Sequence, residues 1–135
     1  MSELFDKAEQ LLNERHSPPV HTVAASLQMK SGEVISALNI DHFVGFVCAE
    51  TAALTIAINQ GYYNFEKVVA VRKNEFGEVA FANMCGKCRQ IFHDYAPDIQ
   101  VETSEGLKLI DELLPMAFTR QRDKIQSVLG VSNEG

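Results

Sequence analysis

Hydrophobic residues follow two different spacings along the chain, and together these predict a series of helices and strands. From residue 2 to residue 16, apolar positions recur every three or four residues between charged ones, which predicts a helix capped by Ser2. Further helices are expected over residues 48–60, 85–95 and 118–129. Segments that alternate, or that are rich in β-branched residues, predict strands over residues 21–29, 33–40, 65–72, 99–102 and 107–110.

The order of these elements predicts a three-layer α/β/α sandwich with a mixed five-stranded sheet between its helices. The helix over residues 48–60 is apolar on almost every side, so we expect it to be buried against the sheet. Asp111 is expected to cap a turn between the last strand and the final helix. The sequence contains no internal repeat and no dividing linker, so residues 1–135 are expected to form a single domain.

The charge of the chain argues against a nucleic-acid polymer as its partner. The net charge is −6, whereas a nucleic-acid binder needs a basic surface to neutralise phosphates. One basic group, made of Arg120, Arg122 and Lys124, lies in an acidic helical tail that we interpret as a solvated face. A small-molecule substrate is therefore expected.

Hydropathy predicts a cytoplasmic chain without a membrane span. No run of about 18 apolar residues is present, as a transmembrane helix would require. The first fifteen residues alternate acidic and apolar positions, and they lack the basic and apolar regions of a secretory signal. With 46% apolar residues, the chain can bury a core without disulfide bonds.

All three cysteines fall in two short stretches, Cys48-Ala49-Glu50 and Cys85-Gly86-Lys87-Cys88-Arg89-Gln90. An odd number of cysteines without an export signal favours metal binding over disulfide bonds. Both stretches begin predicted helices, where about half a positive charge favours thiolates. Cys85 and Cys88 are three residues apart, so one helical turn directs both sulfurs the same way.

These features predict a three-thiolate site for one Zn²⁺ per chain, with Cys48, Cys85 and Cys88 as ligands. Glu50 would not bind the metal but would transfer protons to and from an activated water. Arg89 is expected to donate hydrogen bonds to a sulfur and so offset the charge of the thiolates.

A structural zinc site closed by His93 or His42 is the alternative interpretation of the cysteines. It leaves Glu50 without a reason to lie at the start of an apolar helix, where an unpaired carboxylate is unfavourable. His16 and His93 are otherwise expected at the surface or at helix ends, and His21 in a strand or at the edge of the core.

The cysteine stretches resemble the three-cysteine branch of the cytidine deaminase family, and the blasticidin-S deaminase subgroup in particular. The resemblance covers most of the chain. Its other matching segments are His21-Thr22-Val23-Ala24-Ala25-Ser26-Leu27, Ser31-Gly32-Glu33, Asn39-Ile40-Asp41-His42-Phe43 and Glu112-Leu113-Leu114-Pro115-Met116-Ala117-Phe118.

The resemblance implies hydrolytic deamination of a cytosine nucleoside, such as cytidine, deoxycytidine or blasticidin S, with loss of ammonia from C4. Glu50 would protonate N3 and then the leaving amine. Asn39 and Asp41 would hold the ribose hydroxyls, and the backbone N–H of Ala49 would meet the ring carbonyl. Phe118 would stack on the base, in this family often across a subunit boundary in a homotetramer.

The sequence leaves some of these roles open. His42 is either a substrate contact or a loop histidine, Asn39 could instead cap a turn, and Phe118 could belong to the core. Deamination of another amino-heterocycle, or a non-catalytic zinc-stabilised homo-oligomeric domain, are the alternative functions.

The chain departs from the family pattern at three positions. Thr51 replaces the usual Arg after Cys-Ala-Glu, and Met84 replaces the usual Pro before the Cys-x-x-Cys stretch. Asp41 is one methylene shorter than the usual Glu. If the missing Arg helps to balance thiolate charge, Arg89 must do so alone.

Overall fold

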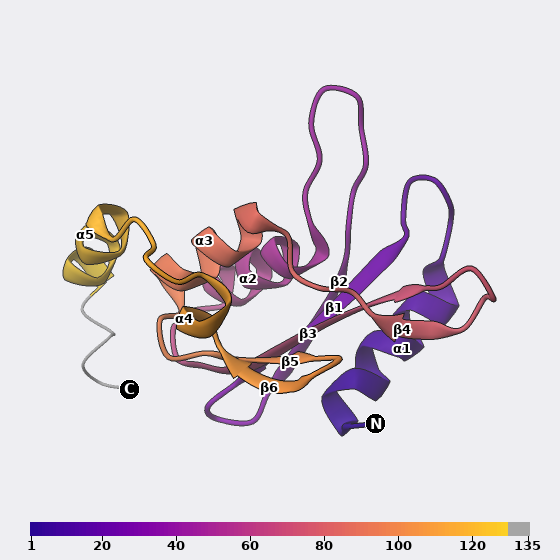
Figure 1. The fold of residues 1–135 in the computed structure, drawn as a ribbon, viewed down its shortest axis with the longest axis horizontal. Coiled ribbons are helices and arrows are strands. Elements are labelled where there is room, and N and C mark those ends of the chain that lie inside the picture. The colour runs from indigo at the N-terminus through magenta and orange to yellow at the C-terminus, as the bar shows by residue number, and fades with distance from the viewer. Residues whose placement is uncertain (130–135) are drawn as a thin grey trace.

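A computed structural model describes residues 1–129, and its helices and strands alternate in nearly the predicted order (Figure 1). The helices are α1 (Glu3–Arg15), α2 (Ala49–Asn59), α3 (Gly86–Tyr95), α4 (Ile110–Leu113) and α5 (Arg120–Leu129). The strands are β1 (Val23–Met29), β2 (Val34–Leu38), β3 (Phe65–Lys73), β4 (Val79–Phe81), β5 (Gln100–Thr103) and β6 (Gly106–Leu109). Among these helices, none is long and apolar enough to span a membrane.

The sheet is mixed, as predicted, and its strands follow the order β2-β1-β3-β5-β6. Strand β1 is antiparallel to both β2 and β3, β3 is parallel to β5, and β5 is antiparallel to β6. These five strands correspond to the five that the sequence predicts. The three-residue strand β4 also pairs with β3 and was not predicted, because three residues are too few to reveal an alternating pattern.

Alternating side chains of the central strand β3 divide the core into two layers. Val69 and Val71 pack with α1, while Val68 packs with α2 and α3 on the other face. Figure 1 shows α1 on one side of the sheet and α2 and α3 on the other. The α/β/α sandwich is therefore confirmed.

Ser2 caps α1 as predicted, since its hydroxyl accepts a hydrogen bond from the Phe5 N–H at 3.0 Å. The Phe5 ring in turn meets Phe81 of β4 edge to face, with 4.9 Å between ring centroids. This aromatic pair holds the unpredicted strand against the first helix.

The C-terminal region differs from the sequence prediction in two respects. At the start of α4, Glu112 rather than Asp111 supplies the cap, because its carboxylate accepts the Leu109 N–H at 2.9 Å. His93, expected at the surface or at a helix end, lies in the last turn of α3 but is only 2% exposed. It is held between Asp94, at 3.0 Å, and Arg122, whose Nη1 lies 3.2 Å from His93 Nε2.

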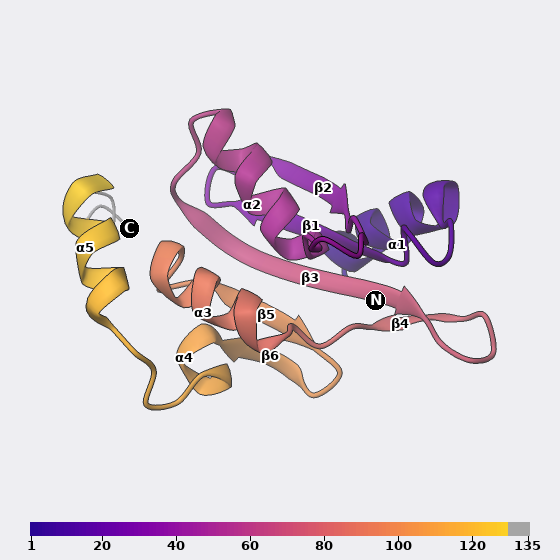
Figure 2. The same ribbon diagram turned by 90° about the horizontal axis from the view of Figure 1, so that it is seen from above.

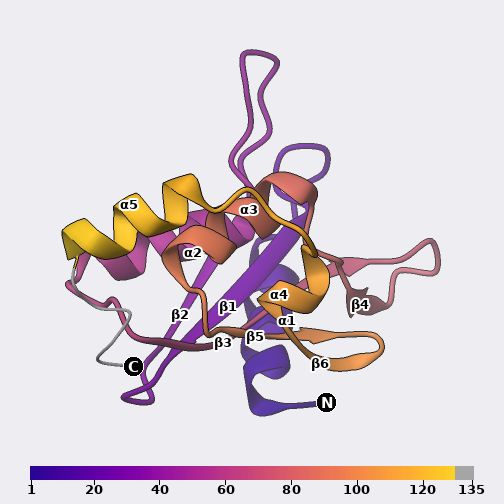
Figure 3. The ribbon, with the colours of Figure 1, turned by 60° about the vertical axis from the view of Figure 1, so that its left-hand side comes forward.

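The contact between Arg122 and His93 joins α5 to α3, and Figure 3 shows these two helices side by side. The sequence suggested that Arg122 lies on a solvated face, but its contact with His93 shows that this face is partly covered. Gln126 adds a second contact by donating to the Asp94 carbonyl at 2.9 Å. The helix that follows Phe118 is thus attached through hydrogen bonds, since none of its described side chains is buried.

Candidate active site

Two helix N-termini, those of α2 and α3, meet on one face of the sheet (Figure 2). Cys48 is the N-cap of α2 and Cys85 is the N-cap of α3, and both have the extended backbone that precedes a helix. Cys88 is the third residue of α3, and its N–H donates to the Cys85 sulfur at 3.5 Å. Buried alanines of α2, at positions 49, 53 and 57, allow this helix to lie close to the sheet.

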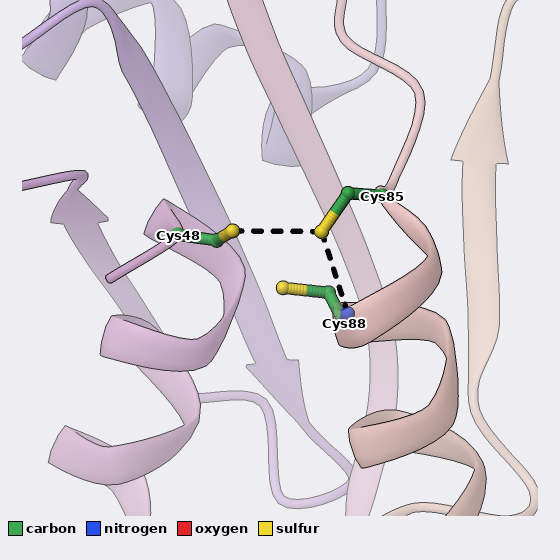
Figure 4. A group of neighbouring side chains, drawn as sticks. All are labelled: Cys48, Cys85 and Cys88. Atoms are coloured by element: carbon green, nitrogen blue, oxygen red, sulfur yellow. Dashed lines mark hydrogen bonds between the residues drawn. The ribbon is translucent and has the colours of Figure 1, made fainter. Parts of the chain in front are cut away.

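The three cysteine sulfurs converge between these helix ends, as Figure 4 shows. All three lie within 4.8 Å of one another, and the Cys48 and Cys85 sulfurs are 3.5 Å apart. Tetrahedral zinc with sulfur ligands at 2.3 Å places them about 3.8 Å from each other. Three soft sulfurs at this spacing therefore fit Zn²⁺, in number, chemistry and separation.

Burial and mutual contacts shift the thiol pKa values in opposite directions. Burial raises the pKa of Cys48, with a further rise from its hydrogen bond to Cys85, and burial also raises the pKa of Cys88. Burial acts on Cys85 in the same direction, but hydrogen bonds from Cys88 and Cys48 leave its pKa lowered. A bound zinc ion deprotonates its thiol ligands and overrides these differences.

Glu50 lies beside the sulfurs and is 5% exposed. Burial raises the pKa of its carboxyl, and a hydrogen bond from its own backbone N–H opposes the rise. Glu50 also lines a cavity of about 160 Å³, together with Cys48 and Cys85. The structure thus places a buried carboxyl next to the three sulfurs and at the wall of one small cavity.

The expected role of Arg89 at the sulfurs is wrong. Its Nε donates to the Met84 carbonyl at 2.8 Å and its Nη1 to the Leu113 carbonyl at 2.9 Å. Arg89 therefore holds the backbone just before Cys85 and connects it to α4. Within residues 1–129, the side chain from outside the cysteine group that reaches a sulfur is Thr51, whose Oγ1 lies 3.1 Å from Cys88 Sγ.

Two of the predicted substrate-binding residues, Asn39 and Ala49, line the cavity. The Asn39 side-chain oxygen accepts the backbone N–H groups of Thr22 and Val23, at 2.8 and 3.0 Å. Asn39 thus fixes the backbone at the start of β1, which is a structural role other than the turn cap that the sequence left open, and its amide nitrogen remains as a donor for a ligand. As the first residue of α2, Ala49 has a backbone N–H without a partner inside the helix.

The other predicted substrate-binding residues, Asp41, His42 and Phe118, lie outside this cavity. Asp41 and His42 belong to a loop that projects from the molecule between β2 and α2 (Figure 3). His42 accepts the Val44 N–H at 3.1 Å and stacks on Phe43. Phe118 is 66% exposed, so it does not belong to the core of this chain.

The described residues give no support to a site closed by histidine. Over residues 1–129 the candidate metal group consists of Cys48, Cys85 and Cys88, and His42 and His93 have the other contacts given above. His21 lies two residues before β1 rather than inside the strand, with Nδ1 2.9 Å from the Asn39 carbonyl oxygen.

Sequence reasoning missed several residues of the cavity wall, among them Val47 and Asn83. Phe46 also lines the cavity, and the Lys87 ammonium lies 4.7 Å from its ring centroid. Val47 and Asn83 lie within two residues of the predicted ligands Cys48 and Cys85 in the sequence. This proximity could have identified them as residues of the site.

Solved structures share this architecture. A crystal structure of the cytidine deaminase from Bacillus anthracis superposes with a TM-score of 0.74 at 22% identity, over 93% of this chain and 94% of that one. The sheet, its helices and the paired helix ends therefore define a deaminase-like α/β/α fold.

Sequence relatives identify the family, although no protein-family model matches the chain. Blasticidin-S deaminase of Bacillus cereus is 36% identical over 128 residues, covering 87% of this chain and 91% of that protein. A probable cytidine deaminase of Dictyostelium discoideum is 25% identical over 128 residues, covering 90% and 85%. The chain belongs to the cytidine deaminase family, whose members are zinc-dependent hydrolases of C–N bonds.

Proposed function

We propose that this protein deaminates cytosine nucleosides of the cytidine, deoxycytidine or blasticidin S type, in the cytoplasm. The single observation that carries the proposal is the buried Glu50 carboxyl, which faces a small cavity beside three clustered sulfurs. The names of two relatives, blasticidin-S deaminase and probable cytidine deaminase, support this class of substrate.

Cys48, Cys85 and Cys88 would hold the zinc, which would make a water acidic enough to react near neutral pH. Glu50 would accept a proton from the attacking water and deliver it to N3 of the ring. A second proton passes through Glu50 to the exocyclic amine as the C4–N bond breaks. The reaction consumes one water, forms a C4–O bond and releases ammonia, which leaves the carboxyl in its starting state.

The cavity wall supplies the groups that orient the ring and the sugar. The free N–H of Ala49 donates to the ring carbonyl oxygen, and the amide nitrogen of Asn39 donates to a ribose hydroxyl. Asp41 follows two residues after Asn39 on the projecting loop and would accept from the same sugar. His42 is a loop residue that contacts substrate only if the loop closes on it.

We further propose a homotetramer in which Phe118 stacks on a base bound to another subunit. The cavity of about 160 Å³ is smaller than the roughly 300–1,000 Å³ of small-molecule sites, so one chain encloses only part of a nucleoside. Phe118 is exposed and lies outside that cavity. The projecting loop exposes further apolar side chains, including Phe43 at 96%.

The test is an assay of the zinc-loaded protein with cytidine, deoxycytidine and blasticidin S, followed by ultraviolet absorbance and by ammonia release. We expect turnover of at least one of the three, and loss of turnover after zinc is removed with a chelator. Turnover of a different amino-heterocycle alone would contradict the proposed substrate class. A protein that binds zinc but releases ammonia from none of them would be a non-catalytic zinc-stabilised domain.

A further inference from the structure

The first turns of α2 and α3 present matching pairs of side chains toward each other. In α3 the pair consists of the N-cap Cys85 and the third helical residue, Cys88. In α2 the same two positions hold Cys48 and Thr51. Residues three apart lie on one side of a helix, so Thr51 occupies the place where α2 would carry a fourth thiol.

Thr51 uses this position to contact a sulfur. Its Oγ1 lies 3.1 Å from the Cys88 sulfur, across the gap between the two helices. Cys88 is 0% exposed, so water cannot readily replace a lost donor at this sulfur. A thiolate carries no proton, and therefore in the metal-bound protein the Thr51 hydroxyl is the donor and Cys88 the acceptor.

Charged donors are directed elsewhere. The Arg89 guanidinium, next to Cys88 in the sequence, donates to the Met84 and Leu113 carbonyls. Lys87 lies over the Phe46 ring and donates to the Phe46 carbonyl at 3.4 Å. The Cys88 sulfur is the most buried of the three. Among residues 1–129, its side-chain hydrogen bond from outside the cysteine group thus comes from the neutral hydroxyl of Thr51.

We propose that Thr51 is a positioning residue of the zinc site, which holds the Cys88 sulfur toward the ion through this hydrogen bond. The inference rests on the proposed three-cysteine ligand set. It assigns to a neutral residue the support that a charged side chain was expected to give. Loss of such an outer partner of a metal ligand typically weakens metal binding about 10- to 100-fold.

The experiment measures zinc release to a colorimetric chelator and the thiolate-to-metal absorption of the Co²⁺-substituted protein. Thr51→Val removes the hydroxyl and keeps the side-chain shape, so we expect zinc release at least about 10-fold faster and a shifted Co²⁺ spectrum. Thr51→Ser restores a hydroxyl and should restore both readouts.

The matched control is Thr55→Val, one turn further along α2. The Thr55 hydroxyl donates to the Thr51 carbonyl at 2.9 Å and does not contact a sulfur. We expect this variant to release zinc as the wild type does. Equal acceleration in both valine variants would assign the effect to helix stability and overturn the proposal.

Two further outcomes separate this inference from the proposed ligand set. Wild-type release and an unchanged Co²⁺ spectrum in Thr51→Val would overturn the role of Thr51 while leaving the site intact. A Cys88→Ser chain that still retains one tightly bound zinc would show that Cys88 is not a ligand, and would overturn both.

Discussion

The two halves of the candidate site, the metal half and the substrate half, are built differently. The metal half consists of three cysteines and Glu50, and all four lie at the starts of two helices that pack on the sheet. The substrate half includes Asp41, His42 and Phe118, which lie on exposed segments outside the cavity. One chain therefore brings together the groups of the proposed chemistry, whereas it encloses only part of the proposed nucleoside site.

The physical reason lies in what fixes each backbone. A helix N-cap is held by the hydrogen bonds of the turn that it begins, and here both helices are also held by buried apolar side chains. The projecting loop is closed by the bridge between Ile40 and Val47, and its tip exposes Phe43 and Val44. The comparison predicts that variants in the metal half abolish function, whereas variants in the substrate half weaken it.

The largest effect is expected from Cys85→Ala, which removes one ligand. The wild type should contain one zinc per chain, and we expect the variant to lose stoichiometric zinc and all measurable turnover, because two thiolates hold the ion poorly. Metal analysis of the purified proteins checks this. Cys85→Ala also removes the N-cap of α3, whose sulfur accepts the Cys88 N–H. Cys85→Ser is the matched control, because the serine hydroxyl would still accept this N–H.

If Cys85→Ala retained one zinc per chain, the assignment of the ligands would be wrong. Cys85→Ser should lose zinc as fully but keep the melting temperature of the metal-free wild type. This pair therefore separates the role of Cys85 as a ligand from its role at the start of α3.

A smaller effect is expected from Phe118→Ala. Stacking of an aromatic ring on a base contributes about 1–3 kcal/mol, so kcat/KM should fall roughly 5- to 150-fold without loss of zinc. Phe76→Ala is the control, because Phe76 is also exposed, at 78% against 66% for Phe118, and lies in the turn before β4. Unchanged kcat/KM in Phe118→Ala would remove Phe118 from the site.

Mixing two inactive or weakened proteins tests whether Phe118 acts across subunits. Glu50→Gln and Phe118→Ala chains are unfolded together, refolded and assayed. If Phe118 serves a neighbouring subunit, some sites regain both Glu50 and Phe118, and activity should exceed the sum of the separate proteins. Activity equal to that sum, or a monomer in sedimentation, would place Phe118 outside any cross-subunit role.

Asn39→Asp should produce a moderate effect on substrate binding. The variant keeps an oxygen that accepts the Thr22 and Val23 N–H groups, but it loses the amide donor for the ribose. We expect KM to rise about 10-fold, equivalent to about 1.4 kcal/mol, with zinc content unchanged. Asn39→Ala, by contrast, should also lower the free energy of unfolding by about 1–3 kcal/mol, because it leaves two donors without a partner.

An unchanged KM for Asn39→Asp would limit Asn39 to its structural role. The alanine variant would then be expected to lose stability without any specific change in substrate binding.

The smallest effect is expected from Arg89→Lys. An ammonium cannot reproduce the two directed hydrogen bonds of Arg89 to the Met84 and Leu113 carbonyls. The free energy of unfolding should fall by about 1 kcal/mol, with zinc release unchanged, since Arg89 does not contact a sulfur. Faster zinc release in this variant, measured as for Thr51→Val, would indicate that Arg89 supports the thiolates after all.

Local patterns predicted that the three cysteines and Glu50 lie in the first turns of two helices. The spacing of Cys85 and Cys88 indicates one helical turn, and the N-terminal position of Cys48 places it at a second helix end, so their convergence followed from the fold class. What a single sequence could not give was the direction of long side chains. Arg89 donates to the Met84 and Leu113 carbonyls and not to the sulfur of Cys88, its neighbour in the sequence.

Long-range pairing explains the remaining differences. His93 is buried because α5 returns over α3 and brings Arg122 to it, a contact between residues far apart in the sequence. Strand β4 pairs with β3, and its Phe81 also packs on Phe5, which is far away in the sequence. The contact of Thr51 with Cys88 was not predicted for a similar reason, since Cys88 lies on another helix.

The most direct test of the central claim compares Glu50→Gln with the wild type, with zinc content and ammonia release measured on the same samples. The substituted amide would keep the size of the side chain but could not carry protons, and general acid–base catalysis contributes roughly 10²- to 10⁴-fold. We predict one zinc per chain in both proteins and a loss of turnover of at least about 100-fold in the variant. Turnover close to wild type in zinc-loaded Glu50→Gln would contradict the account.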